Sequence, residues 1–187
     1  MSETRHRRSI RLKEYDYSQA ASYFVTICTQ NREALFGCIL DGKMILNQWG
    51  EIVKDFHAET EAHFETILMT PFVIMPNHYH AIIVLNGRDS VNGRDHITGR
   101  DHRKGRGDPA PTVGNAVPTL GNVVGFFKYQ TSKRINLLRQ TPGQKLWQRN
   151  YYEHVIRDET DYNRICKYIE NNPLKWESDS LRIGSTP

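Results

Sequence analysis

Alternating hydrophobic and polar positions predict strands in four parts of the chain. Residues 23–29 form a β-branched and aromatic run, and residues 151–157 alternate later in the sequence. Residues 78–85 run from a histidine pair into an apolar stretch, and the tight turn MPN before them predicts an antiparallel hairpin. The first arm of that hairpin, residues 65–77, contains Pro71, which predicts a bulge or an edge strand because proline cannot donate to a β-ladder.

Three other segments carry apolar residues at helical spacing. Residues 47–64 begin with an asparagine suited to N-capping, residues 119–141 end before a Pro-Gly pair, and residues 159–172 follow Asp158 as a cap. One stripe of the second segment is expected to face the core; it comprises Leu120, Val124, Phe127, Thr131, Ile135 and Leu138.

The order strand, helix, strand, strand, helix, strand, helix predicts an α+β fold of ferredoxin-like type, with an antiparallel sheet and helices packed mainly on one face. We expect a basic N-terminal arm at residues 1–20, a single domain at 21–177 and a C-terminal tail at 178–187. Residues 87–117 are expected to form a flexible insertion, because they begin with a polar six-residue repeat (GRDSVN, GRDHIT, GRDHRK) and continue into a proline-rich stretch.

The apolar runs, such as residues 81–85, are far shorter than the ~20 residues needed to cross a bilayer, and the charged N-terminus lacks an apolar signal segment. We therefore expect no membrane association and a cytoplasmic location. The cysteines Cys28, Cys38 and Cys166 form no CxxC pair, so buried thiols are expected rather than disulfides or a thiolate zinc site.

Basic residues cluster in two acid-free stretches of a chain whose net charge is +4. Such clusters are typical of a surface that lies against phosphates, although a solvated basic face that binds nothing remains an alternative. The first stretch, residues 5–13, contains Arg5, Arg7, Arg8, Arg11 and Lys13; the second, residues 109–152, contains Lys128, Lys133, Arg134, Arg139, Lys145 and Arg149.

Two features carry candidate chemistry. His78 and His80 are two apart on a strand, so they share a face and could hold one metal ion, or they could be two polar residues at a strand end. Tyr129 falls about 180° from Leu120 on the helical projection, opposite the apolar stripe. It is either a surface tyrosine or a functional one, and Lys133 lies one turn away.

Three separated motifs, MPNHYHAIIVL, VGFFKYQTSKRIN and LWQRNYYEHVIRDETDYNRICKYIENNP, resemble the REP-associated tyrosine transposases (RAYTs) of the single-tyrosine HUH superfamily over residues 23–176. The resemblance implies an enzyme that cleaves and rejoins single-stranded, hairpin-forming DNA near its own gene through a 5′-phosphotyrosine intermediate. It implies that His78 and His80 hold Mg²⁺ or Mn²⁺ and that Tyr129 is the nucleophile. Relatives of this branch are monomers, so a monomer is expected, with a dimer as the alternative.

The sequence departs from the insertion-sequence relatives at one position. Those relatives have a glutamine metal ligand one turn after the tyrosine, whereas this chain has Lys133, which cannot bind metal while protonated. His154 and Gln148 are therefore candidates for a third ligand, and Lys133 is expected to contact phosphate or to steady the ionised tyrosine. Tyr151 and Tyr152 are rival nucleophiles.

The expected DNA contacts extend the basic surface. Tyr151 and Tyr152, beside Trp147, are expected to pack or to form a platform on which a base stacks. The candidate DNA contacts are Trp147, Lys128, Lys133, Arg134, Arg149, Arg7 and Arg8. Two other function classes share this charge and fold: a nucleic-acid binding module without catalysis, and a metal phosphoesterase that uses water. Covalent attachment of Tyr129 to DNA distinguishes the transposase from both.

Overall fold

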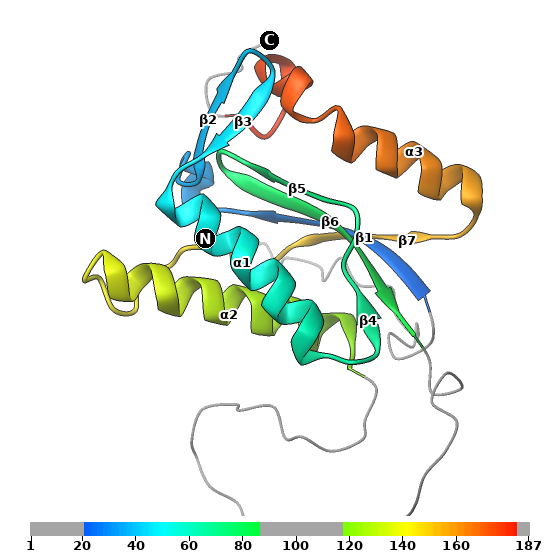
Figure 1. Cartoon of the computed structure of the whole chain (residues 1–187), viewed down its shortest axis with the longest axis horizontal. Helices are drawn as coiled ribbons and strands as arrows, with labels where there is room; N and C mark the ends of the chain where they lie inside the picture. Colours follow the sequence, from blue (N-terminus) through cyan, green and yellow to red (C-terminus); the bar gives the residue numbers. More distant parts are fainter. Residues whose placement is uncertain (1–20, 87–117, 183–187) are drawn as a thin grey trace, which may run out of the picture.

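The computed structural model describes residues 21–86 and 118–182, and its centre is an antiparallel sheet (Figure 1). β1 (Ala21–Cys28) pairs with β6 (His78–Leu85) on one side and with β7 (Tyr152–Ile156) on the other. β4 (Ile67–Leu68) and β5 (Phe72–Met75) both pair with the free side of β6. All these pairings are antiparallel, as the sequence predicts.

The helices cover the two faces of the sheet unequally. α1 (Gln48–His63) and α2 (Leu120–Leu138) lie on one face, and α3 (Glu159–Glu170) lies on the other (Figure 1). Successive side chains of β1 point to opposite faces of the sheet. Tyr23 belongs to the core under α1 and α2, whereas Phe24 packs against α3. The predicted α+β class is confirmed, with two of these three helices on one face.

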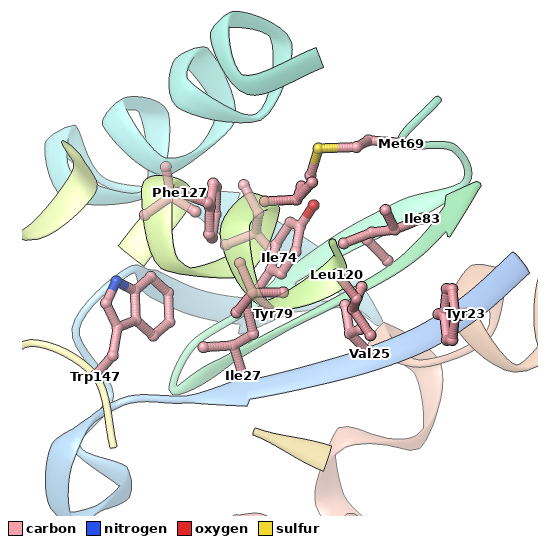
Figure 2. Close-up of a cluster of buried hydrophobic side chains, with 14 of the residues drawn as sticks. Tyr23, Val25, Ile27, Met69, Ile74, Tyr79, Ile83, Leu120, Phe127 and Trp147 are labelled. Atoms are coloured by element: carbon pink, nitrogen blue, oxygen red, sulfur yellow. The ribbon is translucent and has the colours of Figure 1, made fainter. Parts of the chain in front are cut away.

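The larger core lies between the sheet and the α1–α2 layer (Figure 2). Tyr79 and Phe127 are both completely buried there, and their rings lie 4.8 Å apart. Each of these large side chains removes an extensive apolar surface from water, so this layer carries most of the hydrophobic stabilisation. No helix in the described parts of the chain is long and apolar enough to span a membrane.

Capping residues set the helix starts where the sequence places them. The Asn47 side chain accepts hydrogen bonds from two backbone amides of α1, and Asp158 accepts one from α3. Thr119 forms a capping box with Asn122 at the start of α2. The predicted core stripe of α2 is wrong at its end: Leu138 is 42% exposed, because the last turn meets the following loop through buried Asn136, whose amide donates to Gln144 O.

A hairpin missed by the sequence interpretation precedes α1. β2 (Gly37–Leu40) and β3 (Lys43–Leu46) pair across Asp41 and Gly42, whose φ angles are 48° and 71°. An Asp-Gly pair between apolar runs is a strong hairpin signal because both positions need positive φ, so the sequence does contain the information.

Of two further predictions, the one for the strand with Pro71 is confirmed and the one for the cysteines is wrong. The strand predicted over residues 65–77 divides at Pro71 into β4 and β5, and both halves lie at the edge of the sheet, as the proline indicates. The cysteines are free, but the expectation of buried thiols is wrong, since Cys38 is exposed and Cys28 and Cys166 are partly buried. Cys38 is exposed because β2 belongs to a two-stranded hairpin outside the main sheet.

Buried His57 makes acid destabilisation an expected property. Its Nδ1 lies 2.7 Å from the Tyr79 hydroxyl, and burial lowers its pKa from 6.5 to about 4. Between those values the unfolded chain binds a proton that the folded imidazole does not, so the free energy of unfolding falls as the pH drops from about 6.5 to 4. The pKa difference corresponds to about 3 kcal/mol.

Chemical denaturation at pH 7 and pH 4.5 measures this effect. We expect His57→Asn to lose less stability over that range than the wild-type chain, although the buried histidines of β6 keep part of the dependence. An identical pH dependence in the two proteins would contradict the assignment.

Candidate functional site

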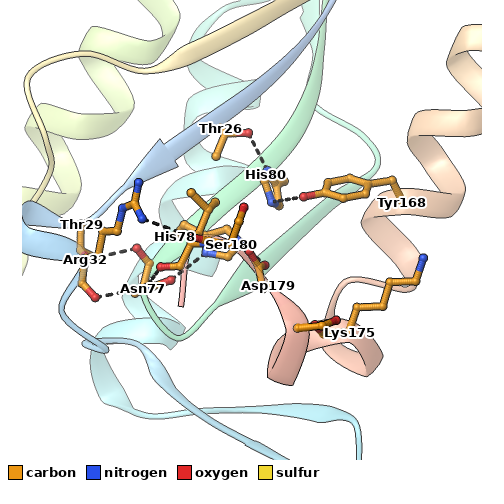
Figure 3. A network of polar contacts seen from close by, with 12 residues as sticks. Thr26, Thr29, Arg32, Asn77, His78, His80, Tyr168, Lys175, Asp179 and Ser180 are labelled. Carbon is orange, nitrogen blue, oxygen red and sulfur yellow. Dashed lines mark hydrogen bonds and ion pairs between the residues drawn. The ribbon is translucent and has the colours of Figure 1, made fainter. Parts of the chain in front are cut away.

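His78 and His80 lie side by side on the face of β6 that α3 covers (Figure 3). They are 0% and 1% exposed, and their ring centroids are 4.5 Å apart. Tyr79 between them points into the core on the opposite face, where it touches Phe127. Strand alternation therefore places the two imidazoles together, and His78 lies at the end of the strand beside the turn.

Asn77 fixes the orientation of the His78 ring. Its amide nitrogen donates to the carbonyls of Arg32 (3.1 Å) and Leu181 (2.8 Å), so its oxygen must be the atom that faces His78 Nδ1 at 2.7 Å. An amide oxygen only accepts, so His78 Nδ1 carries the proton and donates. His78 Nε2 therefore keeps its lone pair, and this buried atom has no hydrogen-bond partner.

His80 is held by three neighbours from different elements. Its Nδ1 lies 2.8 Å from the Thr26 hydroxyl on β1, and its ring stacks on Phe24 at 5.2 Å. Its Nε2 lies 3.4 Å from the Tyr168 hydroxyl on α3, a long contact. The ring is thus oriented through Nδ1, with Nε2 on the side of α3.

Both imidazoles are neutral near pH 7. Burial lowers the pKa of His78 to about 4, against an opposing effect of the Asp179 carboxylate. Burial, followed by the neighbouring His78, lowers the pKa of His80 well below its usual value. Neutral imidazoles are the form that binds metal ions.

Asp179, which caps the 3₁₀ helix η3 (Pro173–Ser178) that follows α3, brings a carboxylate to the pair. Its Oδ2 lies 3.7 Å from His78 Nε2, and its Oδ1 accepts a hydrogen bond from Leu181 N at 2.7 Å. Arg32 donates to Ser180 O at 3.2 Å, and Asn77 donates to Leu181 O, so the segment is tied to the sheet (Figure 3). Asp179, which falls in the C-terminal tail predicted over residues 178–187, therefore lies beside His78.

Asn172 is a second oxygen-bearing side chain at the pair. It is 3% exposed, and its Oδ1 is buried without a hydrogen-bond partner. The amide lies close enough to raise the pKa of His78 and to lower that of Tyr168, although its contact with His78 lacks hydrogen-bond geometry. The sequence motif ends in NNP, but nothing in its pattern singles out Asn172 or Asp179 as site residues.

These atoms fit a divalent cation that takes mixed nitrogen and oxygen ligands. His78 Nε2 is an unpartnered buried lone pair, and its ring is oriented through the other nitrogen in the manner of metal-binding histidines. Within residues 21–86 and 118–182, no group of three or more His, Cys, Asp or Glu side chains stands ready at metal-binding spacing. The possible ligands at this site are therefore the two imidazoles and the nearby oxygens of Asp179 and Asn172.

The structure gives the two predicted third ligands other partners. His154 Nε2 lies 2.6 Å from Asp161 Oδ2, and Gln148 Nε2 donates to Thr29 O at 3.2 Å. No contact in the described part of the chain joins either side chain to His78 or His80. The groups that do approach the pair are Asp179, Asn172 and Tyr168.

Tyr129 lies on the other layer from the histidine pair. It is 52% exposed on α2, and Lys133 Nζ is 5.8 Å from its ring centroid. No described contact connects it with the histidines, but both parts lie at one end of the sheet. The neighbouring Lys128 donates to Gln148 O, Gln148 N donates to Cys28 O, and Cys28 is the register partner of His78.

The rival tyrosines differ in their exposure. Tyr151 packs partly buried against the larger core, and Tyr152 is 51% exposed on β7. Tyr168, which the sequence interpretation did not consider, has its hydroxyl nearest the pair, and burial raises its pKa. A raised pKa disfavours the ionised, nucleophilic form.

Of the predicted DNA contacts, the one at Trp147 is wrong. It is 5% exposed and packs on Phe36 and Phe127, with its Nε1 donating to Thr131 at 2.8 Å, so its ring has no free face for a base. Its apolar surface and its indole N–H are both satisfied inside the core. The remaining basic candidates are exposed on α2 or on the loop before β7; they are Lys133, Arg134 and Arg149.

Lys128 is anchored rather than free. Its Nζ donates to Gln148 O at 2.6 Å and to Arg149 O at 3.0 Å, and burial lowers its pKa to about 8. This lysine therefore holds the loop to α2, which positions Arg149. Arg7 and Arg8 lie outside the described residues.

An α+β domain with a buried, neutral histidine pair on a central strand is the class that this fold and site define. Comparison with known proteins gives a relative from Haemophilus influenzae, an uncharacterized protein, that is 40% identical over 178 residues, 95% of this chain and 94% of the relative. The chain belongs to the same family as this protein. No family model matches the chain.

A solved structure of a REP-associated tyrosine transposase bound to a REP hairpin is similar in fold. The TM-score is 0.55 at 19% identity, and the match covers 94% of this chain and 74% of the other. The resemblance carried by the three sequence motifs is thus confirmed at the level of the fold.

Proposed function

We propose that the protein is a metal-dependent tyrosine transposase, an endonuclease that cleaves and rejoins single-stranded, hairpin-forming DNA through a 5′-phosphotyrosine intermediate. The observation that carries the proposal is the buried histidine pair in which His78 Nε2 is unpartnered, on the fold of a REP-associated tyrosine transposase. Because the similar protein is bound to a REP hairpin, DNA hairpins are the substrate class we assign.

His78 and His80 would hold Mg²⁺ or Mn²⁺ through their neutral imidazoles. When bound, such a cation polarises the scissile phosphate and stabilises the charge that develops during cleavage. Asn77 and Thr26 orient the two rings through Nδ1; this leaves His78 Nε2 for the ion, whereas His80 Nε2 would exchange its long contact with the Tyr168 hydroxyl for the ion.

Tyr129 is the proposed nucleophile. Its phenolic oxygen loses its proton and attacks the phosphorus, the bond from phosphorus to the 3′ oxygen breaks, and that oxygen takes up a proton. The new tyrosine ester is chemically similar to the phosphodiester it replaces, so reversal by a 3′ hydroxyl rejoins DNA without ATP. The Lys133 ammonium lies 5.8 Å from the ring centroid, where it can contact the phosphate that the tyrosine attacks.

The substrate strand must connect two layers of the protein. Tyr129 and His78 lie at the same end of the sheet but are associated with opposite faces, so the strand reaches the pair around that end. The tyrosine comes from the same chain or from a second copy. Lys133, Arg134 and Arg149 are exposed on this route and would hold the backbone phosphates.

A binding module without catalysis is the second candidate, favoured by the missing contact between Tyr129 and the pair. The two functions are separated by incubating labelled single strands from both flanks of the protein's own gene with Mn²⁺, followed by a denaturing gel. We expect Mn²⁺-dependent cleavage of the single strand and none of the fully paired duplex. Tight, salt-sensitive binding without cleavage would favour the binding module.

A further inference from the structure

Two side chains near His78, Asn172 and Asp179, bring oxygen atoms that could bind a cation together with the histidine pair. Asn77 makes His78 Nε2 an acceptor, Asn172 Oδ1 is a buried acceptor without a hydrogen-bond partner, and Asp179 Oδ2 lies 3.7 Å from His78 Nε2. A bound cation would satisfy the two buried atoms that have no hydrogen-bond partner, His78 Nε2 and Asn172 Oδ1, with the Asp179 carboxylate beside them.

The side chains of Asp179 and Asn172 both have fixed positions in the structure. Asp179 uses Oδ1 to accept from Leu181 N, which leaves Oδ2 on the side of His78. Asn172 follows Asn171, the C-cap of α3; it is 3% exposed, and its Oδ1 is buried without a hydrogen-bond partner.

We infer that Asp179 and Asn172 complete a cation site with His78 and His80, supplying the oxygen ligands that the histidine pair lacks. The inference rests on the proposed function and names the residues of its metal site. Carboxylate and amide oxygens are the ligands that Mg²⁺ and Mn²⁺ prefer, whereas two imidazoles alone suit softer ions. The residues at the two ends of η3, and not His154 or Gln148, then provide the further ligands.

Mn²⁺ binding, measured by electron paramagnetic resonance of the free ion, tests this without DNA or turnover. We expect Asp179→Asn to weaken Mn²⁺ binding by about tenfold or more, with a melting temperature without metal close to the wild-type value, because asparagine retains the oxygen that accepts from Leu181. Glu170→Gln is the matched control, since it removes one carboxylate from an exposed position on α3.

A double variant tests whether the carboxylate binds the metal ion or only supports the structure. Moving the carboxylate, by combining Asn172→Asp with Asp179→Asn, is expected to restore at least part of the Mn²⁺ affinity. Unchanged or tighter binding in Asp179→Asn, with binding abolished in His78→Ala, would overturn the inference and leave the histidine site intact. No Mn²⁺ binding to the wild-type chain would overturn both the inference and the proposed metal dependence.

Discussion

Replacing Tyr129 by phenylalanine is expected to abolish DNA cleavage, by about four orders of magnitude or more, because the variant lacks the oxygen that forms the covalent bond. DNA binding and the melting temperature should stay close to the wild-type values. The side chain is 52% exposed and its hydroxyl has no described partner in α2 or elsewhere in the described residues, so its removal leaves no unsatisfied group.

Tyr152→Phe is the matched control, since this tyrosine is 51% exposed. A rate assay with labelled single strands, run beside a filter-binding assay, measures both effects. Cleavage that survives in Tyr129→Phe would refute the nucleophile assignment and favour a phosphoesterase that uses water or another tyrosine, with Tyr168 the nearest to the pair.

Removing either histidine of the pair is the change with the second largest expected effect. His78→Ala and His80→Ala should each reduce metal-dependent cleavage by about a thousandfold or more, because the loss of a ligand removes the positive charge that stabilises the transition state. DNA binding should persist, since the exposed basic residues carry it.

Loss of a buried histidine also lowers stability, so this experiment needs a control of similar burial. His57 is 7% exposed, packs on Phe72 and lies in the opposite layer of the sheet. His57→Ala should lower the melting temperature but retain cleavage when assayed well below it. Equal loss of cleavage in all three variants would mean that the histidines of β6 act only through the fold.

Local signals in the sequence are sufficient for most of the fold. Asn47, Thr119 and Asp158 cap the helices because their side chains satisfy free backbone amides, an effect that depends on neighbouring residues alone. Alternation likewise places His78 and His80 on one face. Asp41 and Gly42 also indicate the β2–β3 hairpin. Its two strands have only four residues each, which is too short for a clear alternation of polar and apolar positions.

The rest of the site depends on contacts between distant residues. Asp179 reaches His78 only because Asn77 and Arg32 bind the segment that follows α3, over separations of about a hundred residues or more. No periodicity encodes such a contact. Trp147 was misassigned for a similar reason, since its burial comes from packing against Phe36 and Phe127.

The central claim is that this chain becomes covalently joined to DNA through Tyr129. The most direct test is mass spectrometry of the protein after incubation with a cleavable single strand and Mn²⁺, with the attached nucleotide mapped to a peptide. The account predicts a phosphonucleotide on Tyr129 that is absent from His78→Ala. Cleavage without any protein-bound nucleotide, or a nucleotide found on Tyr152 or Tyr168 instead, would contradict it.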